Sequence, residues 1–144
     1  VSGGRENNAS ENHSSVTGGR NNIASGQDAL VAGGLDNTAS ATGTAIMGGA
    51  SNSAESPSAS IAGGNNNVAS GPASSILGGN SNTASGGGAT VIGGNSNEAA
   101  GNESTVGGGL LNTATGNFSA VGGGRDREAV GNEDWVAGSL VEDN

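Results

Sequence analysis

The chain contains no cysteine, no lysine and no tyrosine, and its 144 residues include one phenylalanine and one tryptophan. Without cysteine, a disulfide framework and a thiolate zinc site are both excluded. Hydrophobic residues make up only 31% of the chain and 30 residues are glycine, so a globular core of large interlocking side chains is also excluded. No apolar run approaches the roughly 18 residues that a membrane-spanning helix requires, and we expect no membrane contact by this segment.

Positive charge is scarce as well. Four arginines oppose thirteen acidic residues, which gives a net charge of -9 and a pI near 4.1. We therefore expect no nucleic-acid partner, because phosphate binding requires a basic surface. Low hydrophobicity with a high net charge is typical of disordered chains. Strict repetition argues for order instead, because repeat architectures need only a thin continuous core.

The sequence repeats every fifteen residues without insertion or deletion. A glycine recurs from Gly3 to Gly138, and a second glycine follows it in every repeat but the last. The residue two positions earlier is always Val or Ile, and the residue six positions later is Ala from Ala9 to Ala129. This spacing fits neither collagen nor a coiled coil. It predicts a β-solenoid with one coil per repeat, whose coils pair as parallel strands about 4.8 Å apart.

Each coil is expected to contain two short strands, with the patterns S-[VI]-x-G and N-x-A-S. Alternation along the first strand turns the Val/Ile side chain and the first glycine inward, and the second strand turns Ala inward. The predicted core ladder has two columns. The Val/Ile column contains Val16, Val31, Ile46, Ile61, Ile76, Val91, Val106 and Val121, and the Ala column contains Ala24, Ala39, Ala54, Ala69, Ala84, Ala99 and Ala114.

Two further columns concern the turns. An Asn column runs from Asn7 to Asn112, and stacked amides can donate to one neighbour and accept from the other. We interpret it as a structural ladder in preference to a recognition ladder. A turn-glycine column lies two residues after Ala, where we expect positive φ. Ala41 and Ser56 interrupt it, which predicts differently built turns there.

The residue after each Val or Ile should point outward. In most coils it is apolar or very small, and its largest members are Met47, Leu77 and Ile92. A free solenoid should be polar on this side, so both faces of the strand are expected to be buried. We predict that these three residues form the interface of an obligate homo-oligomer.

Several repeats resemble a known family. The stretches "SSVTGGRNNIASG", "SSILGGNSNTASG" and "STVGGGLLNTATG" are similar to the YadA-like head repeat of trimeric autotransporter adhesins, S-V-A-I-G-x-x-S-x-A-x-G. The resemblance implies an all-β, narrow, left-handed parallel β-roll that assembles as a homotrimer on a bacterial outer-membrane surface. Two features depart from the family: glycine replaces its second inward Ile, which would thin the core, and the repeat is one residue longer.

The sequence offers no catalytic, cofactor or metal site. The one histidine, His13, is expected to be a solvated turn residue. Glu103 and Glu133 share a column two coils apart, about 10 Å by strand spacing, too far to share one calcium ion. The rare residues Arg5, Arg20, Phe118 and Trp135 are the candidate surface contacts.

The chain is interpreted as a single head segment spanning residues 1–144. Regular repeats occupy 1–124, and 125–144 form a degenerate terminal coil or cap, in which Trp135 replaces the usual small or hydroxyl residue and Ser139 replaces glycine.

The leading hypothesis is non-enzymatic, extracellular adhesion to a host matrix protein or another surface. The alternative is a structural segment of a phage or other extracellular fibre. An ice-binding solenoid is disfavoured because the threonine ladders are interrupted.

Overall fold

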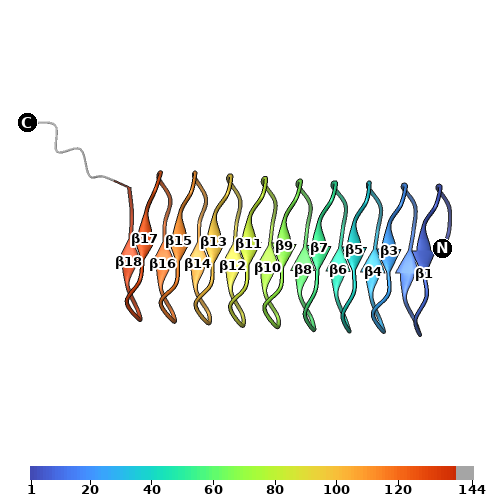
Figure 1. Cartoon of the computed structure of the whole chain (residues 1–144), viewed down its shortest axis with the longest axis horizontal. Coiled ribbons are helices and arrows are strands. Elements are labelled where there is room, and N and C mark those ends of the chain that lie inside the picture. Colours follow the sequence, from blue (N-terminus) through green and yellow to red (C-terminus); the bar gives the residue numbers. More distant parts are fainter. Residues whose placement is uncertain (139–144) are drawn as a thin grey trace, which may run out of the picture.

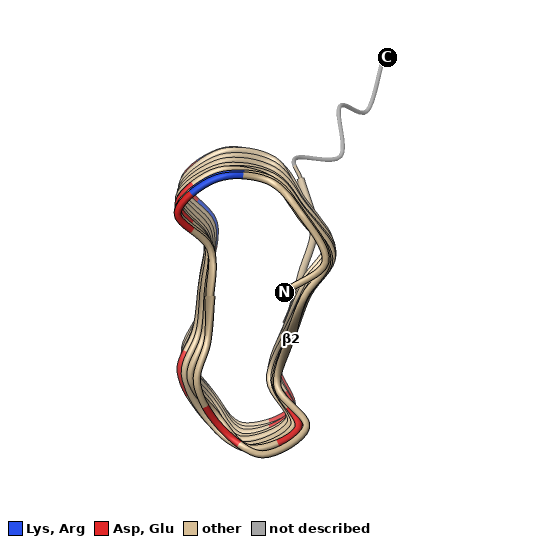
Figure 2. Cartoon of the chain, turned by 90° about the vertical axis from the view of Figure 1, so that its right-hand side faces the viewer, with Lys and Arg blue, Asp and Glu red and all other residues tan. Residues whose placement is uncertain are grey.

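A computed structural model describes residues 1–138 as a straight rod of stacked coils (Figure 1). Two nine-stranded parallel sheets run along the rod, and these described residues contain no helix. Seen along its axis, the rod is a flattened ring with two long walls joined by two tight turns (Figure 2). The predicted all-β parallel β-solenoid is therefore confirmed.

Each strand is only two residues long, shorter than the four-residue patterns in the sequence. The first sheet contains β1 (Asn8–Ala9), β3 (Ile23–Ala24), β5 (Thr38–Ala39), β7 (Ser53–Ala54), β9 (Val68–Ala69), β11 (Thr83–Ala84), β13 (Glu98–Ala99), β15 (Thr113–Ala114) and β17 (Glu128–Ala129). The second contains β2 (Ser15–Val16), β4 (Leu30–Val31), β6 (Ala45–Ile46), β8 (Ser60–Ile61), β10 (Ser75–Ile76), β12 (Thr90–Val91), β14 (Thr105–Val106), β16 (Ala120–Val121) and β18 (Trp135–Val136).

The register places every residue beside its equivalent fifteen residues later. Val16 pairs with Val31, and Ala24 pairs with Ala39, as the period predicts. A third line of parallel bridges, which the sequence analysis missed, runs along one turn from Arg5 to Arg125. The chain therefore pairs with itself along three lines.

The interior is built from small side chains. The Val/Ile column from Val16 to Val121 and the Ala column from Ala24 to Ala129 are completely or almost completely buried. A third inward column lies two residues before each Val or Ile and was not predicted. Its buried members are Ala29, Thr44, Ala59, Ser74, Ala89, Ser104 and Ser119.

The first glycine of each pair does not face this core. A Cβ built on Gly18 or Gly63 would meet nothing within 4 Å, so the expected inward placement is wrong. The strand has already ended at the Val or Ile two residues earlier, and the alternation of sides no longer applies. The core is therefore not thinned by these glycines.

The second glycine is required by the backbone. Gly64 has a φ of +91°, and a Cβ there would overlap the carbonyl oxygen of Gly79 in the next coil. Only glycine combines this conformation with so close an approach. The two glycines of one pair thus have different physical roles.

We expect Gly63→Ala and Gly64→Ala to act in opposite directions. Gly63→Ala should stabilise the rod by about 0.4–1 kcal/mol, because it restricts the unfolded chain and adds a methyl group in open space. Gly64→Ala should destabilise it by at least about 2 kcal/mol through strain and overlap. Thermal melting followed by circular dichroism measures both, and equal effects would contradict the distinction.

The turn-glycine column has a different cause from the one predicted. Gly71 does not have positive φ; a Cβ there would overlap the carbonyl of Gly86 in the next coil. The left-handed conformation occurs two residues later, for example at Ala73. The Gly71 N–H donates to the Ala84 carbonyl at 3.1 Å. Close stacking therefore selects these glycines.

Hydroxyl groups inside the third inward column differ in their partners. Thr44 Oγ1 donates to the Ala41 carbonyl at 2.7 Å. Within the described chain, the buried Oγ atoms of Ser74, Ser104 and Ser119 have no hydrogen-bond partner. A buried hydroxyl without a partner costs its desolvation energy.

Ser104→Ala should therefore raise the unfolding free energy by roughly 1 kcal/mol. Alanine already occupies the equivalent position at Ala89, so it fits the space. Thr44→Val is the matched control, because it removes a bonded hydroxyl while keeping the side-chain size, and it should be destabilising. Denaturant unfolding of both variants provides the test, and a destabilised Ser104→Ala would show that its hydroxyl has a partner.

Candidate interaction surfaces

The Asn column is internal. Asn37 is completely buried, and its Oδ1 accepts the backbone N–H of Asn52 at 3.0 Å. Its Nδ2 donates to the carbonyls of Gly33 and Gly49 at 3.1 and 3.0 Å. The side-chain amides therefore bond mainly to backbone groups and not to each other. This corrects the expected amide-to-amide ladder. Such a buried column fastens the Gly-Gly turn to the next coil and cannot recognise a ligand.

Other asparagines form exposed ladders that the sequence analysis did not find. Asn65 Nδ2 donates to Asn80 Oδ1 at 3.2 Å, and Asn80 Nδ2 donates to Asn95 Oδ1 at 3.4 Å. The signal available in the sequence was the recurrence of Asn at this spacing over three consecutive repeats.

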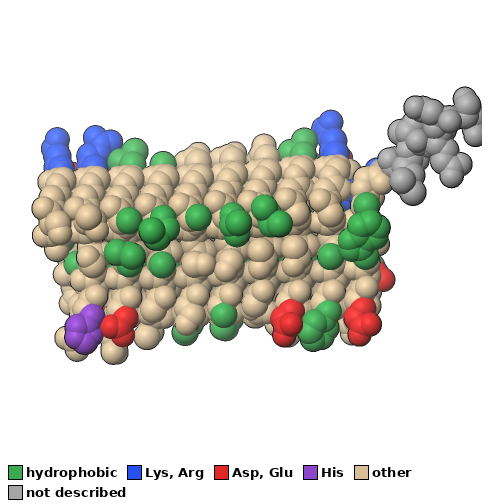
Figure 3. Space-filling view, turned by 180° about the vertical axis from the view of Figure 1, so that it is seen from behind, with side chains coloured by type: hydrophobic (Ala, Val, Ile, Leu, Met, Phe, Trp, Pro, Cys, Tyr) green, Lys and Arg blue, Asp and Glu red, His purple; other side chains and the backbone are tan. Residues whose placement is uncertain are grey.

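One wall of the rod has no charged side chain in the described residues, and we call it the uncharged face. It is the outer side of the sheet that contains β2 and β18, where side chains on either side of each Val or Ile point outward. One column contains Ser15, Leu30, Ala45, Ser60, Ser75, Thr90, Thr105, Ala120 and Trp135, and the other contains Thr17, Ala32, Met47, Ala62, Leu77, Ile92, Gly107, Gly122 and Ala137. Hydrophobic side chains form rows along this wall (Figure 3).

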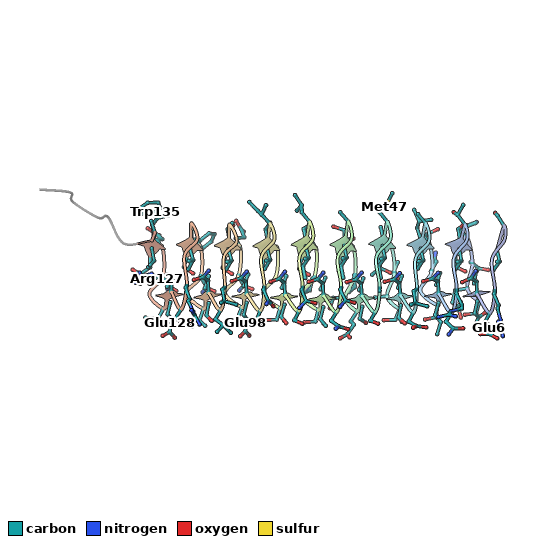
Figure 4. The ribbon with its side chains drawn as sticks, turned by 90° about the horizontal axis from the view of Figure 1, so that it is seen from above. Glu6, Met47, Glu98, Arg127, Glu128 and Trp135 are labelled. Carbon is teal, nitrogen blue, oxygen red and sulfur yellow. The ribbon has the colours of Figure 1, made fainter. Side chains whose placement is uncertain are left out.

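Charge is confined to the other sides. The wall that contains β2 is without coloured residues along its length in Figure 2. Met47 and Trp135 project from one side of the rod, whereas Glu6, Glu98 and Glu128 project from the opposite side (Figure 4).

The three residues predicted to form an interface lie on the uncharged face with about half of their surface exposed. Met47 is 56%, Leu77 54% and Ile92 51% exposed. They share one column, and Leu77 and Ile92 lie on neighbouring coils. A row of large apolar side chains on a wall without charge is typical of a protein interaction surface.

The four candidate surface contacts do not form one site. Arg5 and Arg20 are neighbours along the third line of bridges, near the N-terminal end. Phe118 lies in a turn with a φ of 57° and is 58% exposed. Trp135 is 71% exposed and belongs to the uncharged face, so only this residue joins the predicted interface.

In the described chain, His13 and the acidic residues are exposed and dispersed along the rod. His13 Nδ1 lies 3.0 Å from Asp28 Oδ1, and the His13 side chain is 81% exposed. In residues 1–138 no three histidine, aspartate or glutamate side chains are placed to share a metal ion. The described chain likewise has no helix able to cross a membrane.

Besides Trp135, the terminal coil departs from the repeat at Arg127 and Asp134. The Asn column ends at Arg127, whose backbone N–H donates to Asn112 Oδ1 at 3.0 Å. Asp134 stands in the third inward column, where its Oδ2 accepts the Gly131 N–H at 2.7 Å. The remaining part of the predicted cap, including Ser139, lies outside the described residues.

No protein-family model matches the chain, and no curated protein matches it. The interaction surfaces must therefore be interpreted from their own chemistry.

We expect the double variant Leu77→Glu/Ile92→Glu to abolish self-association. Two carboxylates per chain would be brought close to those of the partner copies in a wall that offers no positive charge. The homotrimer expected from the family resemblance has a mass of roughly 40 kDa, three times 13.4 kDa, and by light scattering the variant should have the mass of one chain.

The matched control is Thr38→Glu/Ser53→Glu, which adds the same charge on neighbouring coils of the opposite wall. It should leave the mass unchanged. A wild-type chain that is a folded monomer at low micromolar concentration would contradict the interface.

Proposed function

We propose that the chain is the non-enzymatic adhesive segment of an extracellular homotrimer on a bacterial outer-membrane surface. The uncharged face is the observation that carries this proposal. If copies of the rod associate through this face, the assembly presents the other sides of the rod once per copy. The repeat's resemblance to the YadA-like heads supports the number three, the left-handed winding and the location.

The described surface supports binding over catalysis. A catalytic site needs several convergent polar groups, whereas the His13 side chain is 81% exposed and pairs with the exposed Asp28. The outward columns instead vary from coil to coil, while the inward Val/Ile, Ala and Asn columns are nearly constant. A fixed interior with a variable exterior suits a scaffold that presents contacts to a large surface.

Repetition gives such contacts their strength. A contact that is weak on one rod becomes effective when three rods offer it together, because the second and third contacts form at a high effective concentration. Binding should therefore depend on assembly. The expected ligand is an extracellular matrix protein or another extended surface.

The test measures mass and binding on the same samples. Wild-type chain and Leu77→Glu/Ile92→Glu are applied to immobilised collagen, fibronectin and laminin, with Thr38→Glu/Ser53→Glu as the control. Wild type and control should bind at least one of these surfaces, and the interface variant should lose binding in proportion to its loss of trimer.

Two outcomes contradict the proposal. Full binding by a monomeric variant would place the site within one chain. A stable trimer that binds none of the three surfaces would favour the alternative, a structural segment of a phage or other extracellular fibre with the same rod.

A further inference from the structure

The fold of a single chain leaves most of the Trp135 side chain exposed. It lies in β18, pairs with Ala120 of the preceding coil, and is 71% exposed. The other residues of its column are Ser, Thr or Ala except for Leu30. A large aromatic side chain left in water stabilises its own chain little, but aromatic residues dominate the energy of protein interfaces.

Beside Trp135, the second column of the uncharged face lacks side chains over two coils. Gly107 and Gly122 occupy the column that contains Met47, Leu77 and Ile92 further along the rod. A Cβ on Gly107 would lie 2.6 Å from the carbonyl oxygen of Gly122, so no side chain fits there. This column of the uncharged face therefore has no side chains between Ile92 and the terminal coil.

Trp135 lies against this stretch of the column. A Cβ built on Gly122 would be 3.9 Å from Cζ2 of Trp135, so the indole reaches from its own coil toward the preceding one. The backbone also changes here, since Gly108 and Gly123 have φ of 148° and 147°, whereas the equivalent glycines of the other described coils lack positive φ. The one tryptophan and the one stretch of this column without side chains thus coincide.

We propose that Trp135 is the anchor of self-assembly and that its indole, which lies over Gly122 of its own chain, packs against the same end of the uncharged face of a second copy of this chain. The inference rests on the homo-oligomer of the proposed function and names the contact that holds it. A second copy is the fitting occupant because the wall has no charge, while a net charge of -9 is distributed over the rest of the chain. Two copies can approach through this wall without opposing carboxylates.

The position of the anchor also sets the direction of the copies. Trp135 and these two glycines lie at the same end of the face, within two coils of each other. Copies that run parallel and in register bring the indole of each chain, lying over its own Gly122, to the level of its neighbour's indole. Antiparallel copies would instead place Trp135 opposite Thr17 and Leu30, at the other end of the face and far from the partner's indole.

The chain provides its own probe, because it has a single tryptophan and no tyrosine. In the assembled wild-type protein, the emission of Trp135 should be shifted to shorter wavelength and quenched several-fold less by acrylamide than in Leu77→Glu/Ile92→Glu. Trp135→Ser should weaken assembly at least about tenfold by light scattering over a concentration series. Leu111→Ser is the control, since Leu111 is 47% exposed but lies in a turn.

Direction is tested by single cysteines in a chain that has none of its own. Met47→Cys and Ile92→Cys should each form disulfide-linked pairs on mild oxidation if the copies are parallel and in register. Linkage by Leu77→Cys alone would indicate antiparallel copies and overturn the proposed direction.

The experiments distinguish failure of the Trp135 anchor from failure of the proposed adhesive function. An oligomer in which Trp135 is as quenchable as in the dissociated variant overturns the anchor but leaves trimeric adhesion standing. An oligomer with Trp135 protected that binds no surface supports the anchor and contradicts adhesion.

Discussion

The constraint on which this structure depends is the spacing of about 4.8 Å between successive coils. Each residue lies beside its own equivalent in the next repeat, so every position must tolerate a copy of itself at that distance. Asparagine satisfies this in the interior because Oδ1 bonds the next backbone and Nδ2 bonds two glycine carbonyls. The second glycine satisfies it because its neighbour's carbonyl occupies the space of a Cβ.

The sequence was most informative where this constraint allows few residue types. The Val/Ile and Ala columns were predictable because both are nearly invariant over the rod. The third inward column was missed because Ala, Ser and Thr at Ala29, Thr44 and Ser74 are equally common on outer walls. Glycine was misread for a related reason. Glycine fits a position of positive φ such as Gly64, a close approach to the next coil such as Gly71, and open space such as Gly63. Only the folded backbone distinguishes these three cases.

The same spacing explains how the rod carries its charge. Two acidic residues on neighbouring coils of one column would be about 5 Å apart and would repel each other. In residues 1–138 no two acidic residues are neighbours in a column; Glu98 and Glu128 are separated by Thr113, and Glu103 and Glu133 by Phe118. Stacking thus disperses the carboxylates along the columns that contain them.

The dispersal of carboxylates along their columns does not explain why the uncharged face has no charged side chain. If acidic residues were placed only to avoid their neighbours, the columns that contain Met47 and Trp135 could hold them as readily as the columns that contain Glu98 and Glu103. Neither column has a charge in the described chain, and both include exposed large apolar side chains. Nothing in the stability of one rod requires this combination. A second rod against the same wall does require it, because carboxylates enclosed between two copies would lose their hydration without gaining a positive partner.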